Sequence, residues 1–80
     1  MKKNIKLLQY IGANIRCLRE ELGYSQEDFA KVAGMERSYY GRIERGQQNM
    51  SMLILAKLCL SLQCNPACLV PDYFTIKELL

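Results

Sequence analysis

The segment LGYSQEDFAKVAGMERSYYGRIERG (Leu22–Gly46) contains two short helical patterns separated by a glycine. Ser25 is suited to cap the first pattern, because its hydroxyl can accept a hydrogen bond from a free amide at a helix start. Gly34 follows at a position where a turn with positive φ would strain other residues. The second pattern begins near Glu36 and ends at Gly46, a residue that tolerates left-handed geometry. The segment therefore predicts a helix-turn-helix unit.

The two predicted helices have complementary apolar sides. Phe29, Tyr40 and Ile43 are expected to fill the wedge between them, and Ala30 is small where the helices approach each other. At about 100° per residue, a different face of the second helix is basic and hydrogen-bonding. That face carries Arg37, Ser38, Gly41, Arg42 and Arg45. A packing side set apart from a basic side is typical of a helix that lies against DNA.

The rest of the chain also has helical patterns and lacks the alternation of strands. Apolar residues at steps of three and four predict a long amphipathic helix that ends at Gly23. Ser51 is expected to cap a further helix, with Leu53, Ala56 and Leu60 on its inner side and Leu55 and Cys59 as further candidates for that side. Shorter C-terminal helices are expected at Asn65-Pro66 and Pro71-Asp72. The prediction is an all-α chain of about five helices.

The length of 80 residues allows one small domain. Chains this short bury only about 60% of their unfolded surface, so stability is marginal and oligomerisation is a common remedy. Half of the residues are apolar, which argues against disorder. The net charge of +3 is compatible with nucleic-acid binding without requiring it.

The cysteines are Cys17, Cys59, Cys64 and Cys68, and they allow disulfides, a zinc site or reduced thiols. Zinc sites usually contain a close pair of ligands, but these cysteines are spaced more widely and the chain has no histidine. Cysteine is also among the most commonly buried residue types. We interpret all four as reduced, mostly structural thiols and expect no bound metal.

The N-terminal segment is basic, and Lys6, Gln9, Asn14 and Arg16 interrupt its apolar residues. An export signal needs an unbroken apolar stretch of about 7–15 residues, and a membrane span needs about 20. We therefore expect a cytoplasmic protein without membrane contact.

The quoted segment resembles the Cro/repressor-type helix-turn-helix family, also called the Xre family. The resemblance extends from Ile11 to Val70, through IGANIRCLREE before the segment and NMSMLILAKLCLSLQCNP after it. Within the family, RSYYGRIERGQQNMS is most similar to the controller proteins of bacterial restriction–modification systems. The resemblance implies a compact five-helix domain of the lambda-repressor-like type over residues 1–80. Its helix-turn-helix would occupy residues 26–45, and residues 51–80 would supply core and dimerisation.

The resemblance also implies an ion pair between Arg19 and Glu44, across the first and third helices. Three residues depart from the family pattern. Tyr40 stands where a branched aliphatic residue is usual, and Glu36 stands where shorter capping residues are commoner. Gly41 lies within the second helix of the motif, at a cost of about 1 kcal/mol. One hypothesis for Gly41 is that its missing side chain lets the helix sit deep in the DNA groove.

DNA recognition by such a unit places the N-terminal part of its second helix in the major groove. Arg37 is expected to read a guanine, Arg42 to read a second guanine or bind a phosphate, and Ser38 to face base edges or backbone. Contacts with the DNA backbone position the protein without reading sequence. They are expected from residues at the edges of the motif: Gln26, Tyr39, Arg45, Gln48 and Asn49.

A single domain reads too few base pairs to find one site in a genome, so we expect a homodimer on double-stranded DNA with a pseudo-palindromic operator. The apolar residues expected at the dimer interface are Leu62, Leu69, Val70, Phe74, Ile76, Leu79 and Leu80.

Other functions receive less support from the sequence. An enzyme is not expected, because the chain has no histidine, no nucleophile–base pair and no glycine-rich phosphate loop. No cofactor or small-molecule ligand is indicated. The alternatives are an antitoxin-type protein-interaction module, a phage-type repressor and, less strongly indicated, a redox or metal sensor that uses the cysteines.

Overall fold

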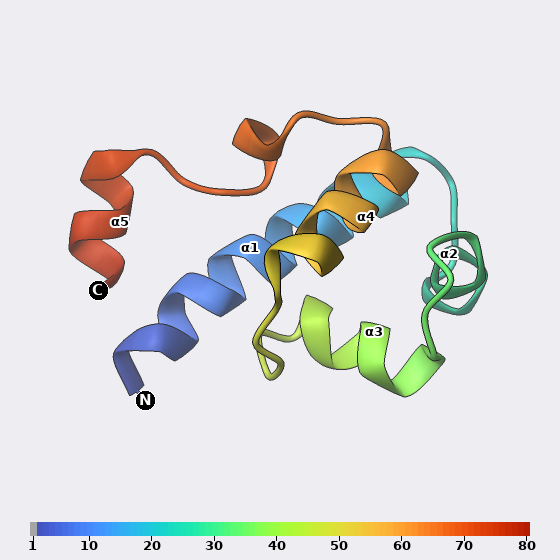
Figure 1. The fold of residues 1–80 in the computed structure, drawn as a ribbon, viewed down its shortest axis with the longest axis horizontal. Helices are drawn as coiled ribbons and strands as arrows, with labels where there is room; N and C mark the ends of the chain where they lie inside the picture. Colours follow the sequence, from blue (N-terminus) through green and yellow to red (C-terminus); the bar gives the residue numbers. More distant parts are fainter. Residues whose placement is uncertain (1) are drawn as a thin grey trace.

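The computed structural model describes the backbone of residues 2–80 and the side chains of residues 5–80. This part of the chain forms five α-helices and one turn of 3-10 helix, without a strand (Figure 1). The elements are α1 (Lys2–Glu21), α2 (Gln26–Val32), α3 (Arg37–Glu44), α4 (Met52–Leu62), η1 (Pro66–Cys68) and α5 (Tyr73–Leu79). The prediction of an all-α, five-helix fold is confirmed. No helix of the described residues combines the length and the apolar character that crossing a bilayer requires.

The predicted helix starts agree with the observed caps. Ser25 Oγ accepts a hydrogen bond from the amide of Asp28 at 3.1 Å, and Ser51 Oγ accepts one from the amide of Ile54 at 3.2 Å. The pair Asn65-Pro66 starts only the short turn η1, and the Asn65 side chain makes no capping hydrogen bond.

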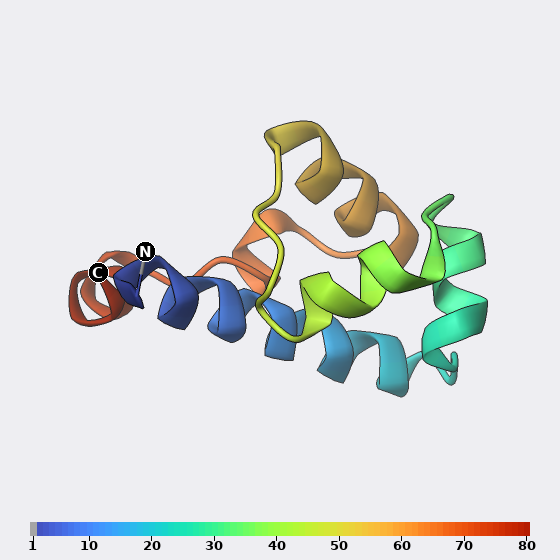
Figure 2. The ribbon, with the colours of Figure 1, turned by 90° about the horizontal axis from the view of Figure 1, so that it is seen from below.

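Helix α1 is the support on which the other elements are arranged. It contacts α3, α4 and α5, and Figure 2 shows α3 and α4 on one side of it. In both views α5 lies beside the start of α1, whereas α2 lies near its end. The helix-turn-helix unit and the C-terminal helix are thus at opposite ends of the molecule.

The wedge between α2 and α3 is filled as the sequence predicted. Phe29, Tyr40 and Ile43 are buried, and the rings of Phe29 and Tyr40 have centroids 5.3 Å apart. Ala30 is also buried at the approach of the two helices. Gly34 has a φ of +69° in the turn, a conformation that favours glycine.

The predicted inner side of α4 is wrong for Leu53, Ala56 and Leu60, which are exposed, whereas Leu55 is half-buried and the prediction for Cys59 is confirmed. Leu53 and Leu60 are 64% and 81% exposed, whereas Leu58, Cys59 and Leu62 are buried. The sequence MLILAKLCLSL is apolar on nearly every face, so its spacing does not identify the side that packs.

The burial of Leu62 and Leu69 also corrects the expected dimer interface. These side chains are 4% and 0% exposed within a single chain. They belong to its core, and they leave little surface for a partner to contact.

A buried carboxylate connects the three N-terminal helices. Glu44 of α3 receives two hydrogen bonds from Arg19 of α1: Nε to Oε2 at 2.7 Å and Nη2 to Oε1 at 3.1 Å. It also accepts hydrogen bonds from the Tyr40 hydroxyl and, at 3.0 Å, from Gln26 Nε2 of α2. The ion pair implied by the family resemblance is present, and the hydroxyl of the unusual Tyr40 has a partner within it.

The pKa values of this group follow from its surroundings. Burial alone would raise the pKa of Glu44, but the hydrogen bonds from Arg19, Tyr40 and Gln26 outweigh it and hold the pKa below its usual value. Burial and the hydrogen bond to Glu44 raise the pKa of Tyr40. At neutral pH, Glu44 is therefore an ionised acceptor and Tyr40 a protonated donor.

Gly12 of α1 is a close-packing position that the sequence analysis missed. A Cβ atom at this residue would lie 2.5 Å from the backbone oxygens of both Ile43 and Glu44. Such a contact with backbone requires the helices to separate. Gly12 therefore sets the distance at which α1 and the end of α3 pack.

All four cysteines are free thiols in the structure. Cys59 is buried, Cys64 is half-buried, and Cys17 and Cys68 are exposed. Burial, followed by the neighbouring thiols of Cys59 and Cys68, raises the pKa of Cys64 to about 11. A thiol with this pKa is protonated at neutral pH. The described residues contain no group of three acidic or cysteine side chains placed to hold a metal ion.

The replacement Gly12→Ala is expected to destabilise the fold by about 1–3 kcal/mol, the usual cost of overpacking. Alanine ordinarily stabilises a helix by about 1 kcal/mol relative to glycine. A loss of stability in place of this gain would therefore identify the close contact between residue 12 and α3. The matched control is Ala13→Gly at the neighbouring exposed position, which should lose only the helix propensity. Urea unfolding followed by circular dichroism measures both, and a Gly12→Ala variant more stable than the wild type would contradict the close approach.

The replacement Glu44→Gln is expected to cost about 3–5 kcal/mol at pH 7, because it leaves the Arg19 charge buried without its counter-ion. The lowered pKa of Glu44 stabilises the wild type above the ordinary glutamate pKa, and this contribution is lost as the pH falls through the lowered value. The unfolding free energy of the wild type should therefore fall more steeply below about pH 4.3 than that of the variant. The control is Glu78→Gln, an exposed change on α5. Parallel pH profiles for wild type and Glu44→Gln would contradict this assignment.

Candidate nucleic-acid interface

Helix α3 is held in place by a cap at its start and by buried side chains towards its end. Glu36 caps its start by accepting a hydrogen bond from the amide of Tyr39 at 3.0 Å. This bond and the Ser38 hydroxyl lower the pKa of Glu36, so its carboxylate is charged and committed to the cap. Tyr40 and the ion-paired Glu44 are buried one turn apart. The direction of the remaining α3 side chains is thereby fixed.

The residues expected to read bases lie on the accessible side of α3. Arg37 and Ser38 are exposed in its first turn, and Arg42 is half-buried one turn later. Arg42 Nε donates to Gln48 Oε1 at 3.2 Å, and its guanidinium carbon lies 5.9 Å from the centre of the Tyr39 ring. Tyr39 and Gln48, expected at the DNA backbone, therefore also orient Arg42.

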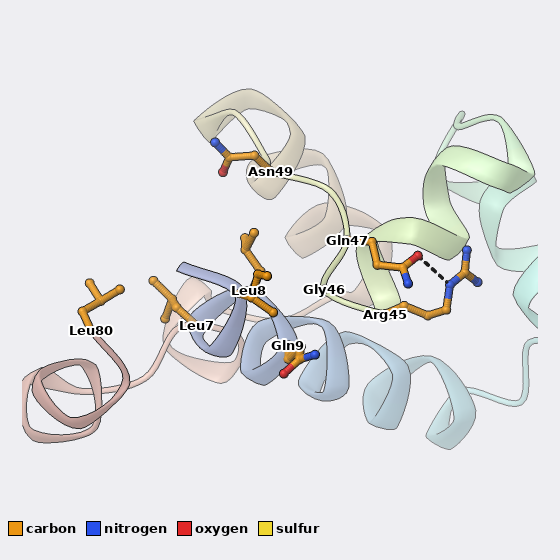
Figure 3. Close-up of a pocket in the computed structure, with 9 residues that line it drawn as sticks. Leu7, Leu8, Gln9, Arg45, Gly46, Gln47, Asn49 and Leu80 are labelled. Atoms are coloured by element: carbon orange, nitrogen blue, oxygen red, sulfur yellow. Dashed lines mark hydrogen bonds between the residues drawn. The ribbon is translucent and has the colours of Figure 1, made fainter. Parts of the chain in front are cut away.

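The loop after α3 carries the other polar residues expected at the backbone. Arg45 Nε donates to Gln47 Oε1 at 3.1 Å, the bond drawn as a dashed line in Figure 3. Asn49 Oδ1 accepts a hydrogen bond from the amide of Met50 at 3.0 Å, and Asn49 is exposed. The side chains after α3 are thus held by local hydrogen bonds.

Gln26 and Gly41 lie where α2 and α3 meet, in surroundings that the sequence did not reveal. Gln26 is half-buried, and its amide nitrogen is used by Glu44. Gly41 is buried, and a Cβ atom there would lie 3.1 Å from Arg45 Nη1 and 3.3 Å from Gln26 Oε1. The space above Gly41 is therefore occupied by the protein's own side chains, so it does not support the hypothesis of close approach to the groove.

A hollow of about 560 Å³ lies between α1 and the loop after α3. Leu7 and Leu8 form an apolar wall, and Arg45 and Asn49 contribute polar groups. Leu80 lies beside Leu7, at the end of the hollow away from Arg45 (Figure 3). The sequence does not reveal this hollow, since it joins segments that are far apart in the chain.

Comparison with known proteins identifies the family. The family description HTH_3 (Helix-turn-helix) matches residues 15–67. The control protein C.SmaI of Serratia marcescens is 35% identical over 52 residues, covering 61% of this chain and 62% of that protein. The control protein C.MunI of Mycoplasma sp is 40% identical over 48 residues, covering 59% and 65%. The chain thus matches less than two thirds of the length of either relative.

A solved structure supports the same relationship. The restriction–modification controller protein C.AhdI from Aeromonas hydrophila is 42% identical, with a TM-score of 0.73 over 78% of this chain and 94% of that chain. These relatives are regulators of a non-enzymatic family, as the sequence predicted. The chain therefore belongs to the helix-turn-helix family HTH_3, and it is similar to restriction–modification controller proteins.

Proposed function

We propose that this protein is a sequence-specific DNA-binding transcriptional regulator that acts as a homodimer on a pseudo-palindromic operator, in the manner of a restriction–modification controller protein. The main support is the geometry of α3. Its buried side, with Tyr40, Ile43 and Glu44, is fixed against α1 and α2, whereas Arg37 and Ser38 are exposed at its start. A helix held in this way presents one constant set of side chains to the major groove.

Arg37 is the first candidate for base readout. Among the described residues, no hydrogen bond or ion pair engages its side chain. Its planar guanidinium matches the O6 and N7 acceptors of guanine. Ser38 follows it, and Arg42, oriented by Tyr39 and Gln48, reaches a second guanine or a phosphate.

Exposed apolar side chains support a homodimer. Among the expected interface residues, Phe74 and Leu80 are exposed, and Val70, Ile76 and Leu79 are half-buried. Large apolar residues of α4 and α5 that were not expected there are also exposed: Met52, Leu53, Leu60 and Tyr73. A second copy that covers such residues adds the burial that a small domain lacks, and it provides the second recognition helix that a symmetric operator requires.

The replacement Arg37→Ala is expected to remove a guanine preference from each half of the operator. Selection from a random duplex pool should give a two-fold symmetric site for the wild type. The variant should lose discrimination by about 1–3 kcal/mol at one position per half-site. Lys6→Ala, at an exposed position near the start of α1, is the control that removes one charge without changing the selected site.

Two outcomes of that selection would contradict the proposal. An unchanged motif for Arg37→Ala would remove this residue from base readout. If the wild type selects no motif and binds weakly, while a second protein co-purifies with it at fixed stoichiometry, the antitoxin-type interaction module replaces DNA recognition.

The replacement Phe74→Asp is expected to convert the dimer into a monomer, since it places a charge in the apolar interface. Phe74 is 74% exposed in the single chain, so the fold itself should lose little stability. Sedimentation equilibrium measures the association, with Val32→Asp, an exposed position on α2, as the control. A Phe74→Asp protein that remains dimeric would exclude this part of the chain from the interface.

A further inference from the structure

A polar hollow of about 370 Å³ lies where α1, α2 and α3 meet, outside the side of α3 assigned to base readout. Its lining residues are Arg16, Arg19, Gln26, Glu44 and Arg45. With the neighbouring Glu20, three guanidinium groups face two carboxylates. The hollow therefore has an excess of positive charge.

The three arginines differ in how far their charges are satisfied. Arg19 is buried, forms two hydrogen bonds with Glu44 and donates a third to the backbone oxygen of Tyr24 at 2.9 Å. Arg16 has a side chain that is 64% exposed, and its ion pair with Glu20 at 3.3 Å is a solvent-exposed pair of little strength. Arg45 is exposed, and among the side chains of residues 5–80 its one hydrogen bond runs from Nε to Gln47. The guanidinium groups of Arg16 and Arg45 are therefore both available to bind an anion, whereas that of Arg19 is used in contacts that stabilise the fold.

Gly41 determines where the Arg45 guanidinium lies. The nitrogens Nη1 and Nη2 of Arg45 are 3.1 and 3.6 Å from the position that a Cβ atom of residue 41 would take. Gln26 Oε1 is 3.3 Å from the same point. The missing side chain thus lets the guanidinium fold back over α3, into the hollow that Arg16 borders from α1.

We propose that Arg16 and Arg45 together bind one phosphodiester group of the DNA backbone, and that Gly41 provides the space for this arrangement. The inference rests on the proposed DNA-binding function, and it assigns a phosphate contact to α1 and a purpose to the glycine within α3. Guanidinium groups suit phosphate oxygens because they donate two parallel, charge-assisted hydrogen bonds. Such a contact positions the recognition helix without reading sequence.

The first test measures how the affinity for the selected operator depends on salt. Arg16→Gln and Arg45→Gln should each weaken binding by a similar factor on every sequence variant of the operator. Because one phosphate is neutralised per chain, the Arg16→Gln/Arg45→Gln double variant should lower the slope of log K against log salt by about 0.9 for each bound chain. Lys6→Gln, at an exposed position near the start of α1 and outside the proposed DNA and dimer contacts, is the charge-matched control and should leave the affinity nearly unchanged.

The second test asks whether Gly41 acts by leaving space for Arg45 or by letting the helix surface approach the DNA closely. Gly41→Ala should fold at least as stably as the wild type, because alanine favours a helix, and yet bind the operator more weakly. In the Arg45→Gln background, Gly41→Ala should cause no further loss. A loss of equal size in both backgrounds would mean that the added methyl group meets the DNA directly, which would overturn the assignment.

Other outcomes also overturn the inference. Unchanged affinity for Arg16→Gln would remove α1 from the phosphate contact, and a double variant whose slope falls by about 1.8 per chain would mean two separate phosphates. In these cases the wild type still selects its symmetric site, so the proposed function stands. Failure of the proposed function is distinguishable, because the wild type itself would then select no site.

Discussion

The buried carboxylate of Glu44 is the constraint on which the arrangement of the first three helices depends. An ionised carboxylate removed from water is stable only when nearly all of its acceptor capacity is used. Here the partners come from three helices: Arg19 on α1, Gln26 on α2 and Tyr40 on α3 itself. Moving any of these helices would break at least one of the bonds. The carboxylate therefore fixes the position of α3 more strictly than apolar packing alone would do.

The same constraint orients the side chains that face outward. Tyr40 and Glu44 lie one helical turn apart on the buried side of α3, and Gly12 lets α1 approach the end of that helix closely. With the buried side fixed, the directions of Arg37, Ser38 and Arg42 follow from the helical repeat. A small domain can thus present a defined surface without a large core, because few interactions, all directional, determine its geometry.

Local sequence features predicted much of this structure. Features that depend on contacts between segments distant in the sequence could not be predicted from it. Ser25 and Ser51 are recognisable as caps because the responsible atoms lie within three residues of each other. The packing side of α4 was predicted only in part, because its sequence is apolar on nearly every face and contacts with α1 and η1 decide which residues are buried. Gly12 looks like an ordinary glycine within a helix, and its role emerges from backbone atoms of α3, far away in the sequence. Gly41 is recognisable in the sequence as an unusual glycine, but its surroundings depend on Gln26 of α2 as well as on the nearby Arg45. The family resemblance supplied the Arg19–Glu44 pair, which no local pattern indicates.

The arginine that stabilises the core differs from the arginines proposed to contact DNA, and their surroundings in the structure differ accordingly. Arg19 is buried and shares its charge with Glu44, so its replacement unbalances the core. Arg37 is exposed, and within residues 5–80 no ion pair involves it. Arg42 and Arg45 lie between these two cases, because each is at the surface but is oriented by a hydrogen bond to a neighbouring glutamine. That orientation reduces the conformational entropy that would be lost on binding. Under the proposed function, a change at Arg37 would therefore alter sequence preference while leaving the fold intact.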